Sequence, residues 1–176
     1  MPQELQNLLS SPGVPELGPG PRAGVLGVDK LDVQLRKPLE GLPFSLQQLI
    51  RAVVYLWHDH FENAHSIAQG IETADGSYLH GILHRREPDY SNARYWFHRV
   101  GKHPCFIPLA EKAAALLAGA AASQLQKLLV PDGKWDPFVF IEACAAASND
   151  DPAEVALLRE IQAAELRLLL EHFLRS

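Results

Sequence analysis

This sequence is poor in cysteine and has no excess of basic residues. Its two cysteines, Cys105 and Cys144, do not form a CxxC pair and are too few to build a disulfide framework, so we expect both to be reduced and buried. The formal net charge is −5, whereas nucleic-acid-binding proteins usually carry a clear basic excess. Composition therefore disfavours a disulfide-stapled protein and predicts that no nucleic acid is bound.

The chain also lacks hydrophobic segments of the length that membranes require. Its longest candidate, Ala113 to Ala122, is about ten residues of mostly alanine, roughly half of the ~20 residues that span a bilayer. Met1 to Ser10 has neither the basic nor the apolar region of a secretory signal. We therefore expect a cytoplasmic protein without a membrane partner.

Three common catalytic motifs are missing as well. The sequence contains no GxSxG nucleophile elbow, no GxxxxGK[ST] phosphate-binding loop and no GxGxxG dinucleotide-binding loop. Cys105 follows His103 by two residues, but adjacency in sequence is poor support for a catalytic pair. No motif therefore identifies a reaction class or a substrate.

The chain divides into an irregular arm and one predicted domain. Its 176 residues suit a single domain better than two. Prolines and glycines are so frequent in residues 11–30 that we expect residues 1–30 to form an irregular arm. Leu31, Val33 and Leu35 alternate with polar residues, which predicts a short edge strand. The later periodicity is helical, so we predict a single all-α domain over residues 31–176 with six to seven helices.

Helical signals begin at Ser45 and recur to the end of the chain. They are clearest at Asp136-Pro137 and Asp151-Pro152, where an acidic N-cap precedes proline at the first helical position. Further helices are expected over residues 59–69, 77–87, 92–100 and 108–129.

One internal similarity indicates helical hairpins. Residues 61–68 align with residues 90–97 at an offset of 29, and both segments read aromatic, two polar residues, alanine, then a large apolar group. This pattern resembles the second helix of tetratricopeptide-like and Sel1-like hairpins, in which the alanine lets two helix backbones approach. We therefore expect hairpin packing of this kind.

Histidine is the residue whose distribution points to a site. Seven of the eight histidines lie between His58 and His103, and imidazole both titrates near neutral pH and ligates metals. At about 100° per residue, a helix that includes His58 places it in one stripe with Glu62 and His65.

The next predicted helix repeats this arrangement. His80, His84 and Glu87 also fall in one stripe at helical spacing. If the two helices form an antiparallel hairpin, the two stripes face each other across its groove. The sequence therefore predicts a polar groove within residues 58–103.

A transition-metal site is one interpretation of this groove. Histidines at i and i+4 form a chelating pair, and imidazoles with few carboxylates favour Zn, Fe, Ni or Cu over Mg or Ca. Glu62-x-x-His65 is also similar to the Glu-x-x-His element of di-iron bundles. The candidate metal ligands are His58, Glu62, His65, His80, His84 and Glu87, with Zn or Fe as the expected cofactor.

A small anionic ligand is the second interpretation. Residues 77–103 hold five Lys or Arg and two Asp or Glu, a local charge of +3 in a chain of −5. Arginine suits carboxylate or phosphate, and aromatic side chains provide flat apolar walls. The candidate ligand-binding residues are His65, His80, His84, Arg94, Tyr95 and Arg99.

Two further alternatives use the same segment. In an enzyme, His80 or His84 would act with Glu62 as general acid and base, because a carboxylate can fix the imidazole tautomer. In a protein-interaction scaffold, the hairpins would bind a partner or a second copy of the chain, and the histidines would be structural.

Residues 55–106 resemble a family of uncharacterised proteins. The resemblance is carried by the pattern DGSYxH…HRRExDYxN…YWFxRVGxHP, which runs from Asp75 to Pro104. It covers less than a third of the chain and implies no activity, cofactor or substrate. The functional argument therefore depends on the residues themselves.

Overall fold

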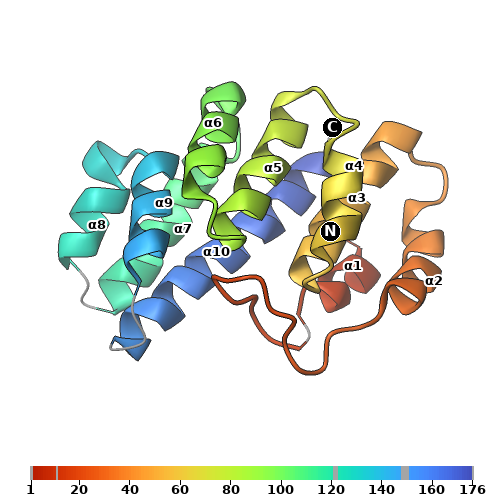
Figure 1. The fold of residues 1–176 in the computed structure, drawn as a ribbon, viewed down its shortest axis with the longest axis horizontal. Coiled ribbons are helices and arrows are strands. Elements are labelled where there is room, and N and C mark those ends of the chain that lie inside the picture. The colour runs from red at the N-terminus through yellow and green to blue at the C-terminus, as the bar shows by residue number, and fades with distance from the viewer. Residues whose placement is uncertain (1, 11, 121–122, 148–150, 176) are drawn as a thin grey trace.

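The computed structural model describes residues 2–10, 12–120, 123–147 and 151–175 (Figure 1). Within these residues the chain is all-helical, with ten α-helices, one short 3-10 helix and no β-strand. The elements are α1 (Gln3–Leu8), α2 (Val28–Leu39), α3 (Phe44–Trp57), α4 (Phe61–Ala68), α5 (Ala74–Arg86), α6 (Tyr90–Val100), α7 (Phe106–Gly119), α8 (Ser123–Leu129), η1 (Pro131–Gly133), α9 (Pro137–Ala146) and α10 (Pro152–Phe173).

The longest helix, α10, connects the two halves of the hydrophobic core. It runs behind the other helices and packs on both α3 and α7 (Figure 1). Leu166 and Leu169 of α10 belong to a cluster built mainly from α1–α6. Leu158 and Ile161 belong to a second cluster, built with α7, α8 and α9. One helix therefore contributes apolar side chains to both clusters.

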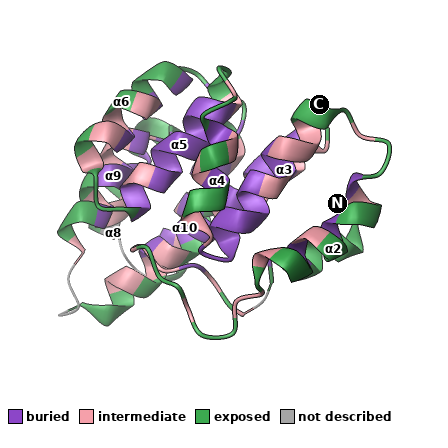
Figure 2. Cartoon of the chain, turned by 45° about the vertical axis from the view of Figure 1, so that its right-hand side comes forward, coloured by how far each residue is buried: buried purple, intermediate pink, exposed green. Residues whose placement is uncertain are grey.

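Helix α5, which carries much of the predicted site, is buried along most of its length between α4 and α6 (Figure 2). The contact with α6 is close because α5 has a glycine there. A Cβ atom added to Gly81 would lie 2.6 Å from the Phe97 ring. The aligned alanines Ala64 of α4 and Ala93 of α6 are both fully buried. Small residues thus let the helices around the site approach one another.

The predicted acidic helix starts are confirmed. The Asp136 carboxylate accepts hydrogen bonds from the backbone N–H groups of Phe138 and Val139, at 2.9 and 3.2 Å. The Asp151 carboxylate accepts one from Glu154 at 3.0 Å. Each carboxylate satisfies backbone N–H groups of the first helical turn that have no carbonyl partner within the helix.

Two predictions about the fold are wrong. The described residues contain more than the predicted six to seven helices, because short helices also form near the N-terminus and after residue 122. The predicted edge strand is part of α2. Leu31 and Leu35 are fully buried there, whereas Val33 between them is 59% exposed. The apolar repeat is therefore the i, i+4 repeat of a helix and not the alternation of a strand.

The helix predicted over residues 108–129 is also divided. It corresponds to α7, which ends at Gly119, and α8, which begins at Ser123. Residues 121–122, at the end of the predicted alanine run, lie outside the described residues.

The predicted irregular arm contains helical structure at both ends, in α1 and at the start of α2. Residues 12–27 between them contain no regular element, but side chains of the helical body bind their carbonyl groups. Arg86 donates to the Glu16 and Gly18 carbonyls at 3.1 and 3.2 Å, and Gln162 donates to Glu16 at 2.8 Å. These contacts hold the segment against α5 and α10.

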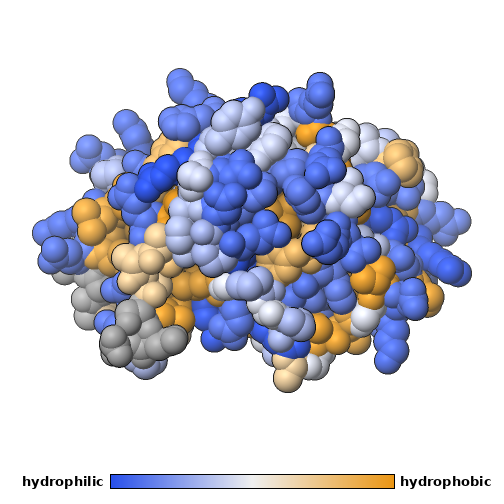
Figure 3. All heavy atoms as spheres, viewed as in Figure 1, coloured by the Kyte–Doolittle hydropathy of each residue, from blue (hydrophilic) through white to orange (hydrophobic). Residues whose placement is uncertain are grey.

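The face in Figure 3 is predominantly hydrophilic, and its hydrophobic patches are small and separate. Among the described residues, no helix combines the length and the apolar character that crossing a bilayer would need.

Candidate functional site

The structure contains two histidine clusters. Each includes residues of α5, at different points along that helix, together with residues of other elements. The three-histidine cluster consists of His65, His80 and His84. The aspartate–histidine cluster consists of Asp75, His103 and His172. The first unites residues that the sequence pattern placed in two facing stripes, whereas the second includes His172, which that pattern did not reach.

In the three-histidine cluster, α4 and α5 bring their imidazoles together. The ring centre of His65 lies 5.2 Å from that of His80 and 5.6 Å from that of His84, with the rings edge to face. The rings of His80 and His84 are nearly parallel, and their centres are 6.1 Å apart. His80 is only 2% exposed and stacks on the Trp96 indole at 4.0 Å.

The surroundings of His80 and His84 favour their neutral imidazole forms. Burial, together with the nearby His65 and His84, lowers the pKa of His80 from 6.5 to about 4. Burial also lowers the pKa of His84, and the charge of Glu87 opposes this only in part. His84 Nδ1 lies 3.3 Å from Glu87 Oε2, and the Asn92 amide lies 3.2 Å from His84 Nε2. The proton of His84 therefore belongs on Nδ1, and Nε2 holds a lone pair.

The cations near these histidines are largely engaged elsewhere. Arg85 is fully buried against Glu165, and Arg86 is fully buried against Asp59. The exposed Arg94 pairs with Glu142 at 3.2 Å. The predicted anion partner Arg99 lies over the rings of Trp96 and Tyr95, at 5.5 and 6.0 Å. This arrangement gives little support to an anionic ligand.

Two predicted site residues make no recorded contact with the cluster. His58 is outside α4, because Asp59 has a positive φ of 63° and the helix begins only at Phe61. The buried His58 ring instead bonds the Leu8 carbonyl through Nε2 at 3.0 Å and accepts the Leu26 N–H at Nδ1. Glu62 is exposed on the first turn of α4. The stripe that started at His58 is therefore incomplete.

The aspartate–histidine cluster joins three distant segments. Asp75 comes from the first turn of α5, His103 from the loop before α7, and His172 from the last turn of α10. Asp75 Oδ1 lies 2.9 Å from His103 Nε2 and 3.3 Å from His172 Nε2. Among the described residues, this is the one group of three whose ligand atoms all lie within 4.8 Å of one another.

Its surroundings are apolar on one side and open on another. The Tyr78 ring packs edge to face on His103, with centres 4.9 Å apart. Next to His172 is a cavity of about 150 Å³ that Cys105 and Leu168 also line. Burial alone would raise the pKa of Asp75, but the hydrogen bond and charge of His103, followed by those of His172, outweigh it, so the pKa is lowered. The carboxylate is therefore ionised at neutral pH.

Sequence reasoning missed this cluster because no local spacing reveals it. The sequence pattern assigns Asp75 no place in either histidine stripe, and it places His103 only beside Cys105. Burial raises the pKa of the Cys105 thiol to about 12, so it is a poor nucleophile. His172 follows His103 by 69 positions (172 minus 103), and only the docking of α10 brings the two together.

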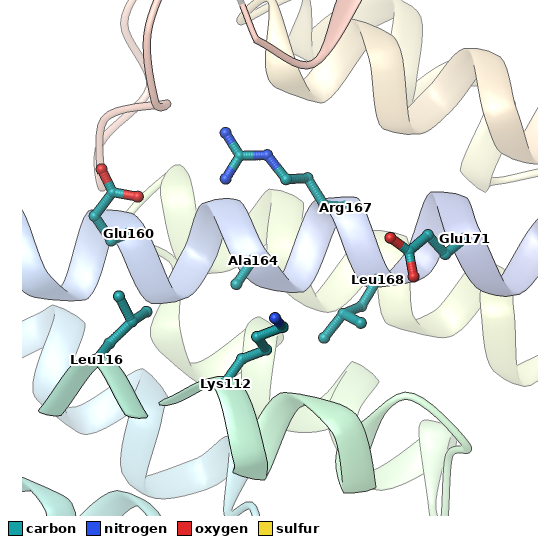
Figure 4. A pocket seen from close by; sticks show the side chains of 7 residues that line it. All are labelled: Lys112, Leu116, Glu160, Ala164, Arg167, Leu168 and Glu171. Carbon is teal, nitrogen blue, oxygen red and sulfur yellow. The ribbon is translucent and has the colours of Figure 1, made fainter. Parts of the chain in front are cut away.

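A larger cavity, of about 300 Å³, lies between α7 and α10 (Figure 4). Lys112 and Leu116 of α7 reach toward α10 from one side. Arg167 extends away from α7, and its guanidinium lies 4.7 Å from the Trp57 ring. The lining mixes basic, acidic and apolar side chains, and among the described residues it holds no group of three metal-ligating side chains close enough to share an ion.

Comparisons of this chain with models of protein families, with curated proteins and with solved structures found no match. The functional argument therefore starts from the chemistry of the two clusters.

Proposed function

We propose that this protein binds a divalent transition metal, Zn or Fe, through Asp75, His103 and His172. The observation that carries the proposal is the convergence of two imidazole nitrogens and one carboxylate oxygen from three separate segments. Two histidines and one carboxylate form a common donor set for both metals, as in zinc enzymes and non-haem iron proteins.

The distances support a shared ion. Ligands held at ~2.0–2.2 Å from one metal, at angles between those of an octahedron and a tetrahedron, lie roughly 3–3.5 Å apart. Asp75 Oδ1 lies 2.9 and 3.3 Å from the two imidazole nitrogens. The ionised carboxylate supplies the negative charge, and the apolar wall of Tyr78 limits the water that competes for the ligands.

The cavity beside His172 suits an open coordination position. Three protein ligands leave at least one position of a zinc or iron ion for water or a small ligand. A space of about 150 Å³ next to His172 would admit such a molecule. This supports a reactive metal centre over a purely structural one.

One local interaction opposes ligation. The Cys105 N–H donates to His103 Nδ1 at 3.2 Å, so the ring proton sits on Nε2 in the metal-free protein. Binding a metal at Nε2 moves that proton to Nδ1, which leaves the buried Cys105 N–H and the new ring N–H without acceptors, at a cost of about 1–3 kcal/mol each. The metal–ligand bonds must outweigh this cost, so the metal affinity itself tests the proposal.

The test is a titration of untagged, metal-free protein with Zn²⁺, and with Fe²⁺ under anaerobic conditions, by calorimetry and thermal shift. We expect Asp75→Asn and His172→Ala each to weaken binding at this site by more than about 100-fold, since losing a ligand should exceed the loss of an outer-shell partner. Asn keeps the size of Asp75 and removes only its charge.

The matched control is His98→Ala, which removes a histidine that packs on Phe138 and belongs to neither cluster. It should leave Zn²⁺ affinity and stoichiometry unchanged. If Asp75→Asn and His172→Ala bind as many Zn²⁺ ions as the parent protein with the same affinities, the proposal is wrong and the cluster only links α5 to α10 by hydrogen bonds.

A further inference from the structure

The geometry points to a second metal site, the three-histidine cluster, which would bind a divalent ion of the Cu, Ni and Zn group through His65, His80 and His84. This inference does not depend on the first site, because the two clusters share no residue. A donor set made only of imidazoles is the kind that these ions favour over the harder Mg²⁺ and Ca²⁺.

The ring positions are close to those of three imidazoles on one ion. Rings that share a tetrahedral metal with M–N bonds of ~2.0–2.1 Å have centres roughly 5 Å apart. The His65 ring lies 5.2 and 5.6 Å from the other two. The remaining pair, His80 and His84, is wider at 6.1 Å and parallel. One side chain must therefore turn toward the others when the ion binds.

His80 is the fixed ligand of this set. Its ring is enclosed and stacks on Trp96 with an angle of 9° between the planes. The buried Nδ1 atom has no partner within normal hydrogen-bond geometry among the described residues, although the backbone of Gly76, one turn earlier, is near enough to oppose part of the lowering of the His80 pKa. His65 and His84 are partly exposed. The His84 ring can therefore turn while His80 stays in place, and the exposed Glu87 side chain can follow it.

His84 already has the support that metal-bound histidines usually have. A ligating imidazole commonly donates its other N–H to a carboxylate, which fixes the ring and its tautomer. Glu87 Oε2 lies 3.3 Å from His84 Nδ1 and supplies that carboxylate. The Nε2 lone pair is directed at the Asn92 amide, which a metal ion would displace.

Metal stoichiometry tests this inference. Untagged, metal-free protein is titrated with Ni²⁺, and bound ions per chain are counted by calorimetry and by elemental analysis after gel filtration. We expect two ions for the parent protein, one for His65→Ala and one for His84→Ala. Asp75→Asn should also bind one ion, because it loses the first site and keeps the second. His98→Ala should keep both.

Paramagnetic broadening locates the second ion. Sub-stoichiometric Cu²⁺ added to Asp75→Asn protein should broaden the NMR signals of the His65, His80 and His84 rings and spare those of His98. The inference is overturned if His65→Ala and His84→Ala bind as many Ni²⁺ ions as the parent, or if the three rings stay sharp. A parent protein that binds one ion, lost in Asp75→Asn, would support the first site alone.

Discussion

At the scale of single residues, buried charge pairs hold the N-terminal segment on the helical body. The Asp59 carboxylate accepts a hydrogen bond from Arg86 Nη2 at 2.6 Å, and both side chains are fully buried. The same carboxylate accepts the Arg22 backbone N–H at 2.9 Å. Truncating Asp59 would leave the Arg86 charge buried without its carboxylate partner, which typically costs about 3–5 kcal/mol.

We therefore expect Asp59→Ala to lower the free energy of unfolding by about 3–5 kcal/mol in urea denaturation. The matched control is Glu142→Ala, which breaks the exposed pair with Arg94 and should cost less than ~1 kcal/mol. If both variants lose the same free energy of unfolding, the buried ion pair stabilises the protein no more than the exposed one.

His58 should make stability depend on pH. Burial, as the largest cause, lowers its pKa below 6.5, and the nearby Arg22 and His60 act in the same direction, whereas the Leu8 carbonyl and Asp59 oppose it. Below about pH 6.5 the unfolded chain therefore binds more protons than the folded protein. The stability from neutral His58 is present above that pH and is lost as the pH falls through the lower, folded-state value.

We expect His58→Gln to flatten this dependence. A glutamine amide can still donate to the Leu8 carbonyl and accept from the Leu26 N–H, but it does not titrate. Urea denaturation of both proteins at several values between pH 8 and pH 5 measures the slope. The same acid-induced loss in parent and variant would exclude His58 as its source.

At the scale of helices, the sequence was most informative where one residue acts on its own neighbours. The acidic caps at Asp136 and Asp151 are confirmed, because a cap depends only on the next three residues. The strand predicted at Leu31 was wrong, since three alternating apolar residues fit either period. The buried Leu39 lies one turn after Leu35, so the buried residues repeat at helical spacing and not at the spacing of a strand.

The contact between α5 and α6 predicts that Gly81→Ala destabilises the protein, whereas helix propensity alone would predict that it stabilises the protein. Alanine is favoured over glycine inside a helix by about 1 kcal/mol. At Gly81, however, the added Cβ would lie 2.6 Å from Phe97, so the ring or the helix must shift. Such overpacking typically costs 1–3 kcal/mol. We expect Gly81→Ala to lower the melting temperature.

Gly119→Ala is the control for that experiment. Gly119 lies at the end of α7, and no atom of the described residues stands within 4 Å of the position its Cβ would take. This variant should be as stable as the parent protein or slightly more stable. A Gly81→Ala protein with unchanged melting temperature would show that α6 can move away from α5 at little cost.

At the scale of the whole molecule, both clusters show what a sequence pattern can and cannot reach. Helical periodicity placed His80 and His84 on one face because both belong to one helix. It could not connect His172 with Asp75, which lies 97 positions earlier (172 minus 75) and on another helix. Such contacts arise from how helices dock, and no local spacing encodes that.

The same limit applies to the N-terminal segment, and deleting it gives the last prediction. Its prolines and glycines indicate irregular structure, but its partners lie far along the chain: Arg159 Nη2 donates to the Val14 carbonyl at 3.0 Å, and His60 Nε2 lies 2.6 Å from the Leu26 carbonyl. Removing residues 1–26 would also strip the Leu8 carbonyl from the buried His58 and the Glu16 and Gly18 carbonyls from the buried Arg86 and Gln162, each lost acceptor costing about 1–3 kcal/mol. It would also remove Leu5, which is fully buried in the core.

We expect the truncated protein to lose most of its unfolding free energy, because several such costs approach the 5–15 kcal/mol of a typical domain. Hydrogen exchange should show faster amide exchange in α3 and α5, against which the segment packs. The control is Gln6→Ala, which changes only an exposed side chain of α1, and this protein should exchange like the parent. Equal protection in the truncated and parent proteins would mean that the helical body is stable alone and that the segment is only a cover.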